Sequence, residues 1–99
     1  MNWRVIIRSE VEQTVAQTAA WYESRQPHLG TEFVEEVIRF WHTLAKNPLL
    51  NSRRHPYKNI RWRYLDRFPY RVIYEADQMQ QTVLVAAVLH AARQSGRGG

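Results

Sequence analysis

Apolar residues change their spacing near position 60 of this chain. Between about residues 10 and 46 they recur every three or four positions, which is typical of helices that bury one face. From residue 60 onward they alternate with polar residues or run together, which is typical of strands. A chain of 99 residues is long enough for one domain and short for two. The spacing therefore predicts a single α+β domain with its helices ahead of most of its strands.

Short breaks divide these two regions into elements. The segments 26–30 and 47–48 interrupt the helical spacing, so we expect two helices, over about 10–24 and 31–46. Their short link makes them an antiparallel hairpin. Strands are expected over about 2–7, 60–65, 69–75 and 82–89. The predicted fold is β-α-α-β-β-β, with the helical hairpin packed on one face of a mainly antiparallel four-stranded sheet.

Local signals refine the ends of these elements. Ser9 followed by Glu12 has the spacing of a capping box, which predicts the start of the first helix. Residues 48–59 contain Pro and Arg and are expected to form a loop. The Gly-rich residues 94–99 are expected to be a flexible tail that follows a domain of residues 1–93.

The last predicted strand implies an uncovered apolar surface. Residues 82–89 are apolar at nearly every position, which is typical of a strand buried on both faces. Two helices, however, cover only one face of a sheet. One row of this strand should therefore face outward, with Arg61, Arg63, Arg71 and Ile73 beside it on the neighbouring strands. We expect an apolar surface with a basic rim, which either binds a partner or is covered by the tail or the 48–59 loop.

Positive charge is concentrated in one part of the chain. The net charge is +5, and seven of the fourteen Lys and Arg residues lie between positions 53 and 71, where Asp66 alone opposes them. The predicted helices are mostly acidic. A concentrated basic patch attracts phosphates or an acidic protein segment, although a solvated basic face that only aids solubility fits the same pattern.

Several classes of site have no support in the sequence. The absence of cysteine excludes disulfides and thiolate chemistry, and it fits a reducing cytoplasm, where we expect the protein to act. The four histidines have no metal-ligand spacing, so neither a metal nor another cofactor is expected. No run of apolar residues is long enough to cross a membrane, and no signal peptide is visible.

Three short motifs resemble one protein family. Leu29-Gly30 ahead of Phe33, Phe68-Pro69-Tyr70-Arg71 with Tyr74, and His90 followed by Arg93 resemble the ParE/RelE superfamily of type II toxin–antitoxin and plasmid-stabilisation toxins, over about residues 2–93. The resemblance implies a cognate antitoxin of acidic character. It also implies one of two activities: RelE-like members cut messenger RNA on the ribosome, and ParE-like members inhibit DNA gyrase.

The resemblance also suggests roles for individual residues. Arg71 matches an arginine that contacts the scissile phosphate in RelE-like nucleases. Those nucleases often carry a tyrosine or histidine just after the last strand, where this chain has Ala91-Ala92. Cleavage of RNA needs an acid and a base, so this difference favours the ParE-like branch. His90 or Tyr74 would have to move the proton in a nuclease.

Binding is therefore the leading expectation, and catalysis the alternative. Trp62 is expected to face the helices, although it could instead stack on a base. A third interpretation is an inert binding module with the toxin fold. The residues expected to contact the antitoxin or the target are Arg61, Arg63, Arg67, Arg71, Val85, Leu89 and Arg93.

Overall fold

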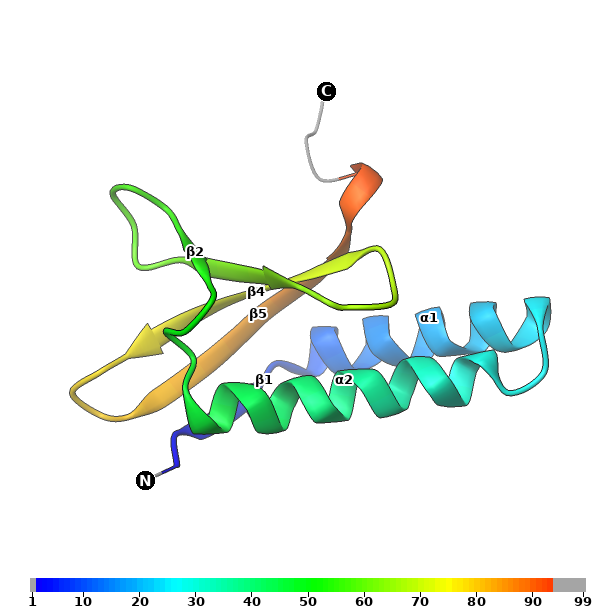
Figure 1. Cartoon of the computed structure of the whole chain (residues 1–99), viewed down its shortest axis with the longest axis horizontal. Coiled ribbons are helices and arrows are strands. Elements are labelled where there is room, and N and C mark those ends of the chain that lie inside the picture. The colour runs from blue at the N-terminus through cyan, green and yellow to red at the C-terminus, as the bar shows by residue number, and fades with distance from the viewer. Residues whose placement is uncertain (1, 94–99) are drawn as a thin grey trace.

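The computed structural model describes residues 2–93, and it contains two layers (Figure 1). The helices α1 and α2 lie side by side on one face of a sheet, and they follow the spacing that predicts them. The elements are β1 (Arg4–Ile7), α1 (Ser9–Arg25), α2 (Leu29–Lys46), β2 (Arg53–Arg54), β3 (Arg61–Tyr64), β4 (Tyr70–Asp77), β5 (Thr82–His90) and the short 3-10 helix η1 (Ala91–Arg93).

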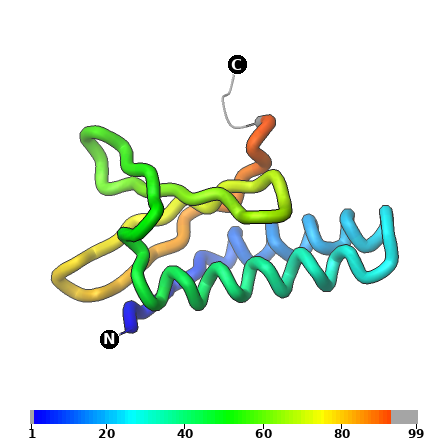
Figure 2. Tube along the Cα trace, viewed as in Figure 1, coloured from blue at the N-terminus to red at the C-terminus, as the bar shows by residue number. Residues whose placement is uncertain are grey.

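The sheet has five strands in the order β1-β5-β4-β3-β2, and it is mixed. β1 runs parallel to β5, and the other neighbours are antiparallel. The expected four-stranded sheet is therefore wrong by one strand. The added strand β2 lies in the segment expected to be a loop, and its two arginines carry no apolar pattern that could have predicted it. The loop between β2 and β3 projects from the sheet (Figure 2).

The core lies between the helices and one face of the sheet. Its centre is fully buried and contains Val11, Phe33, Leu44, Tyr74 and Val83. Aromatic rings of both layers meet at one end, where Tyr22 and Phe33 pack with Phe68 and Tyr70. Amphipathic spacing explains this arrangement, because the inward row of α2 is apolar apart from Glu36 and the fully buried residues of β4 and β5 are apolar or aromatic.

The helical hairpin is closed by Gly30 and Glu23. A Cβ atom at Gly30 would collide with the backbone carbonyl of Ala19, so only glycine lets the two helices approach this closely. The Glu23 carboxylate accepts hydrogen bonds from the backbone N–H groups of His28 and Gly30, at 2.8 and 3.0 Å. It thereby satisfies backbone donors at the start of α2. His28, the residue before this helix, has a left-handed backbone conformation.

The capping box predicted at Ser9 is wrong. Arg8 occupies the cap position of α1, and no side chain accepts a hydrogen bond there. Ser9 is the first helical residue instead. The helix begins directly after β1, so its start is fixed by the strand and not by a side-chain cap.

A β-bulge in β5 decides which of its residues face the helices. Ile73 pairs with Ala87, but the next residue, Tyr74, pairs with Val85, so Ala86 is the extra residue. The alternation shifts by one at this point. Val83, Val85 and Val88 are buried under the helices, and Leu84, Ala87 and Leu89 face the other way. Val85, which we expected to contact a partner, is therefore a core residue with no exposed surface.

The turn between β3 and β4 is fastened to α2 by a buried carboxylate. One oxygen of Glu36 accepts the backbone N–H groups of Asp66 and Arg67, at 2.6 and 3.0 Å. The side chain is only 6% exposed. This carboxylate is buried because the turn folds over it.

Candidate binding site on the open face of the sheet

Strand register assigns the residues of the sheet face that the helices leave uncovered, because directly paired residues share a face. We call this surface the open face. One row across it contains Arg53, Trp62, Ile73 and Ala87, and the next contains Tyr64, Arg71 and Leu89. On the other side of the first row lie Ile6, Leu84 and Glu75.

The open face has two chemically different halves. Towards β1 and β5 it is aliphatic, with Ile6 40% and Leu89 37% exposed. Towards β2 and β3 it is aromatic and basic. There the Arg71 guanidinium carbon lies 5.6 Å from the centre of the Trp62 ring, within the range of a cation–π contact. An apolar surface bordered by cations is typical of an interaction site.

Arg71 keeps part of its hydrogen-bonding capacity unused. Its Nε atom is buried and has no hydrogen-bond partner among residues 2–93. Tyr64 is paired directly with Arg71 across the strands and is 47% exposed. A guanidinium held against an aromatic ring and flanked by an exposed phenol can bind a carboxylate or a phosphate.

Arg61 and Arg63 do not lie on the open face, which corrects the expectation for both. They pair with Tyr74 and Val72, whose side chains face the helices. The Arg61 Nη1 atom donates to the Ser52 hydroxyl at 3.0 Å. The Arg63 guanidinium carbon lies 5.3 Å from the centre of the Phe40 ring.

The expected orientation of Trp62 is wrong for the same reason. It faces outward with Arg71, where a helix-facing position was predicted. Apolar content misled the assignment, because the long aliphatic stems of arginine can cover core surface at a sheet margin.

The two proton-transfer candidates lie away from Arg71. Tyr74 is fully buried, and its hydroxyl donates to the Pro48 carbonyl at 2.6 Å. Burial raises its pKa above the ordinary value of a tyrosine. This position corrects the expectation that Tyr74 could reach a substrate.

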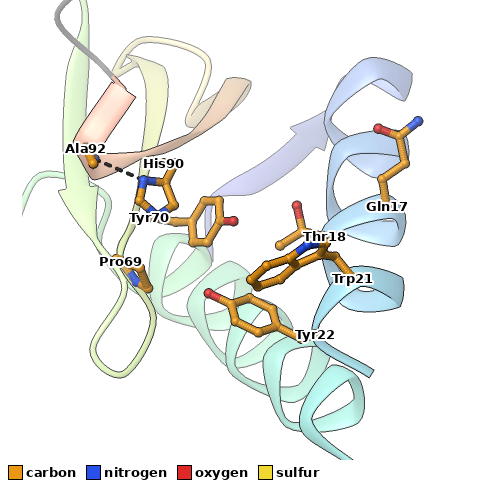
Figure 3. Close-up of a pocket in the computed structure, with 8 residues that line it drawn as sticks. All are labelled: Gln17, Thr18, Trp21, Tyr22, Pro69, Tyr70, His90 and Ala92. Atoms are coloured by element: carbon orange, nitrogen blue, oxygen red, sulfur yellow. Dashed lines mark hydrogen bonds between the residues drawn. The ribbon is translucent and has the colours of Figure 1, made fainter. Parts of the chain in front are cut away.

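His90 pairs with Tyr70 and faces the helix side of the sheet. Its Nδ1 atom accepts the Ala92 backbone N–H at 3.0 Å, which assigns the ring proton to Nε2 in a neutral histidine. The ring lines a cleft of about 600 Å³ between the end of β5 and α1. Figure 3 shows Tyr22, Tyr70 and Trp21 around the same cleft. Within this cleft His90 packs edge-on against Tyr70.

The remaining expected contact residues lie at the margins. Arg67 pairs with Glu32 of α2 at 2.7 Å, and this hydrogen bond raises its pKa above the usual value. It therefore holds the β3–β4 turn on the helix layer and does not border the open face. The side chain of Arg93 lies outside the described residues. Among residues 2–93 no three His, Asp or Glu side chains gather as a metal site.

Comparison with known proteins decides the family. The family described as the ParE toxin of the type II toxin–antitoxin system parDE matches residues 5–95. The chain belongs to this toxin family. The resemblance noted in its motifs is thereby confirmed. No curated protein sequence matches the chain significantly. Within the described part of this toxin, no helix is long and apolar enough to cross a bilayer.

Solved structures of RelE-type toxins share the fold of this ParE-family toxin. The toxin–antitoxin complex RelBE2 of Mycobacterium tuberculosis has a chain that is 18% identical, with a TM-score of 0.63 over 91% of this chain and 99% of that chain. The RelE–RelB complex of Pyrococcus horikoshii has a chain that is 15% identical, with a TM-score of 0.62 over 94% of this chain and 99% of that chain. An arginine-substituted Escherichia coli RelE in the free state is 12% identical, with a TM-score of 0.65 over 95% of this chain and 88% of that chain. These identities are low, so the likeness concerns the fold.

Proposed function

We propose that this toxin is neutralised by a cognate acidic antitoxin bound across the open face, and that it inhibits DNA gyrase by binding. The observation that carries the second part is the separation of Arg71 from both proton-transfer candidates. Tyr74 is sealed in the core, and His90 faces the opposite side of the sheet. A nuclease needs an acid and a base within hydrogen-bond reach of the phosphate that its arginine holds.

The two halves of the open face suit two parts of an antitoxin segment. Aliphatic side chains of the antitoxin would pack over Leu84 and Leu89, and carboxylates would pair with Arg71 and Arg53. β1 is an edge strand, so an extended segment could also add to the sheet beside it. Two of the structurally similar proteins are toxin–antitoxin complexes, which supports a partnership of this kind.

The antitoxin contact is testable by substitution on the open face. Leu89→Glu should weaken binding by about a hundredfold or more, because it places a charge in the apolar half opposite an acidic partner. Met79→Glu is the matched control, since Met79 is 95% exposed in the β4–β5 turn. Isothermal titration with the cognate antitoxin measures both. Equal affinities of the two variants would contradict the assignment of the open face.

The target is testable with purified components. The protein should inhibit supercoiling by gyrase and accumulate cleaved gyrase–DNA complexes, while primer extension on translated messages shows intact RNA. Addition of the antitoxin should restore supercoiling. Specific cleavage of translated messages with unaffected gyrase would reject this target.

One observation favours a second function, a ribosome-dependent messenger RNA endonuclease. Tyr64 is exposed and directly opposite Arg71, so a phosphate bound there would have a phenol beside it. His90 and Tyr74 were the expected proton donors, and Tyr64 has the better position. In this alternative Tyr64→Phe and Arg71→Ala would each abolish message cleavage on ribosomes. If the protein instead inhibits gyrase, that inhibition should survive Tyr64→Phe.

An inert binding module remains the third candidate. Its signature is simple to measure. Induced expression of the wild-type chain without antitoxin would leave growth unchanged, and the antitoxin would still bind. Growth arrest on induction excludes it and leaves the choice between gyrase and the ribosome to the two assays above.

A further inference from the structure

The hairpin formed by β2, β3 and the loop between them projects from the sheet, away from the two helices (Figure 2). Its strands are antiparallel and are joined by the pairs Arg53–Trp62 and Arg54–Arg61. The hairpin is therefore a short two-stranded ribbon whose tip reaches into solvent. We call residues 53–62 the basic ribbon.

The positive charge of the basic ribbon has no acidic residue near it in the sequence. Arg53, Arg54 and Lys58 are exposed, and none of them forms an ion pair within the described part of the chain. The chain has no Asp or Glu between Glu36 and Asp66. The three cations are therefore available to a polyanionic partner.

The cations lie on both faces of the basic ribbon. Arg53 shares the open face with Trp62. Arg54 follows it in the same strand, so its side chain points to the opposite face. A partner that contacts both arginines must have negative charge on each side of the ribbon. The two phosphate backbones that border a groove of a nucleic acid duplex have this arrangement, whereas a flat acidic protein surface would meet one face only.

The tip of the basic ribbon is held by its own hydrogen bonds. The His55 N–H donates to the Ile60 carbonyl at 2.9 Å. The Nδ1 atom of His55 accepts the backbone N–H groups of Tyr57 and Lys58, each at 3.0 Å. The Tyr57 side chain is 91% exposed at this tip. A tip ordered in advance loses little conformational entropy when it binds a partner.

The shape of the basic ribbon distinguishes between kinds of nucleic acid. The major groove of B-DNA is about 12 Å wide and admits a two-stranded β-ribbon. The major groove of duplex RNA is deep and too narrow for protein side chains to read. In the DNA groove, the ring of Tyr57 at the tip can contact the methyl groups of thymine. Duplex DNA therefore fits the ribbon better than duplex RNA does.

We propose that the basic ribbon inserts into the major groove of duplex DNA. Arg53 and Arg54 contact phosphates of opposite strands, Lys58 contacts a phosphate beside the tip, and Tyr57 meets the base edges. Bound in this way, the toxin is held on the DNA that gyrase cleaves. This last step rests on the proposed function, whereas DNA binding itself does not.

Fluorescence anisotropy with the full-length toxin and a labelled DNA duplex of about two helical turns tests the basic ribbon. Three phosphate contacts predict that the affinity falls at least about fortyfold between about 50 and 200 mM NaCl. Loss of one contact in Lys58→Gln should make this fall about 3.5-fold smaller. Lys46→Gln, at the exposed end of α2, is the matched control and should keep the salt dependence of the wild type. An unchanged salt dependence in Lys58→Gln would overturn the proposal.

Tyr57→Ala supplies a second measurement, because the ring carries no charge. It should weaken DNA binding by about fivefold or more at each salt concentration and leave the salt dependence as in the wild type. The exposure of Tyr57 predicts an unchanged melting temperature, which confirms that the variant is folded. Undiminished DNA affinity in this variant would overturn the placement of the tip.

The kind of nucleic acid is decided by competition. The DNA duplex should bind about fivefold or more tightly than a duplex RNA of the same sequence and than its separated strands. Equal or tighter binding of either RNA form would overturn the choice of duplex DNA.

Supercoiling assays test the step that involves gyrase. The concentration of Tyr57→Ala needed for half-inhibition should be about threefold or more above that of the wild type. An unchanged concentration would overturn the role of the basic ribbon on DNA held by gyrase. Absence of inhibition by the wild type would instead reject the proposed function, and the anisotropy titration would still decide whether the basic ribbon binds DNA.

Discussion

At the scale of single residues, a buried carboxylate holds one turn of the sheet on the helices. Glu36 accepts two backbone N–H groups with one oxygen, and its other oxygen is buried without a partner among residues 2–93. Removal of the side chain leaves two donors unpaired. Glu36→Ala should therefore lower the free energy of unfolding by about 2–4 kcal/mol. Urea denaturation measures the change, and Glu35→Ala, at an exposed neighbour, should cost less than about 0.5 kcal/mol.

Glu23 makes the stability of the helical hairpin depend on pH. Backbone hydrogen bonds from His28, and then from Gly30, lower the pKa of this carboxyl in the folded protein. A carboxyl whose pKa is lower in the folded protein stabilises the fold at pH values above the pKa of the unfolded chain, about 4.3. This stabilisation is lost as the pH falls through the pKa of the folded protein. The melting temperature of the wild type should therefore fall further between neutral and acidic pH than that of Glu23→Gln. Parallel melting curves from pH 7 downward would contradict this role.

At the scale of elements, the sequence predicts the helices and the long strands well. α2 and β5 have strong apolar periodicity, and both lie within two residues of their predicted bounds. β2 was missed because two arginines carry no pattern. The open face was predicted to exist, and Arg71 and Leu89 lie on it. Arg61, Arg63 and Val85 were placed there wrongly, because strand alternation alone cannot reveal a bulge or an arginine that packs inward.

The bulge at Ala86 gives β5 its two different apolar rows. Deletion of Ala86 removes the extra residue, so the strand returns to plain alternation with Val83, Val85, Val88 and His90 still on the helix side. We expect this deletion to cost less than about 1 kcal/mol of stability. Deletion of Leu84 makes Val83 and Val85 adjacent, so one of them leaves the core, at a cost of at least about 2 kcal/mol. Near-ultraviolet circular dichroism and urea denaturation measure both losses, and an equal loss for the two deletions would contradict the assignment of the bulge.

At the scale of the whole molecule, the two layers carry opposite charge. Six glutamates belong to the two helices, and half of the arginines lie between positions 53 and 71. We therefore expect an acidic antitoxin to be steered to the sheet layer. Its association rate should fall by about tenfold or more between low salt and about 0.5 M NaCl, whereas its dissociation rate should change little. Stopped-flow fluorescence measures both rates, and a salt-independent association rate would argue against steering.

Hydrogen exchange of the toxin with and without its cognate antitoxin tests the binding account most directly. The account predicts slower exchange in β1 and β3, which carry the open-face residues Ile6, Trp62 and Tyr64, and unchanged exchange along the solvent side of α1 and α2. Protection confined to the two helices, with exchange in β1 and β3 unaltered, would contradict it.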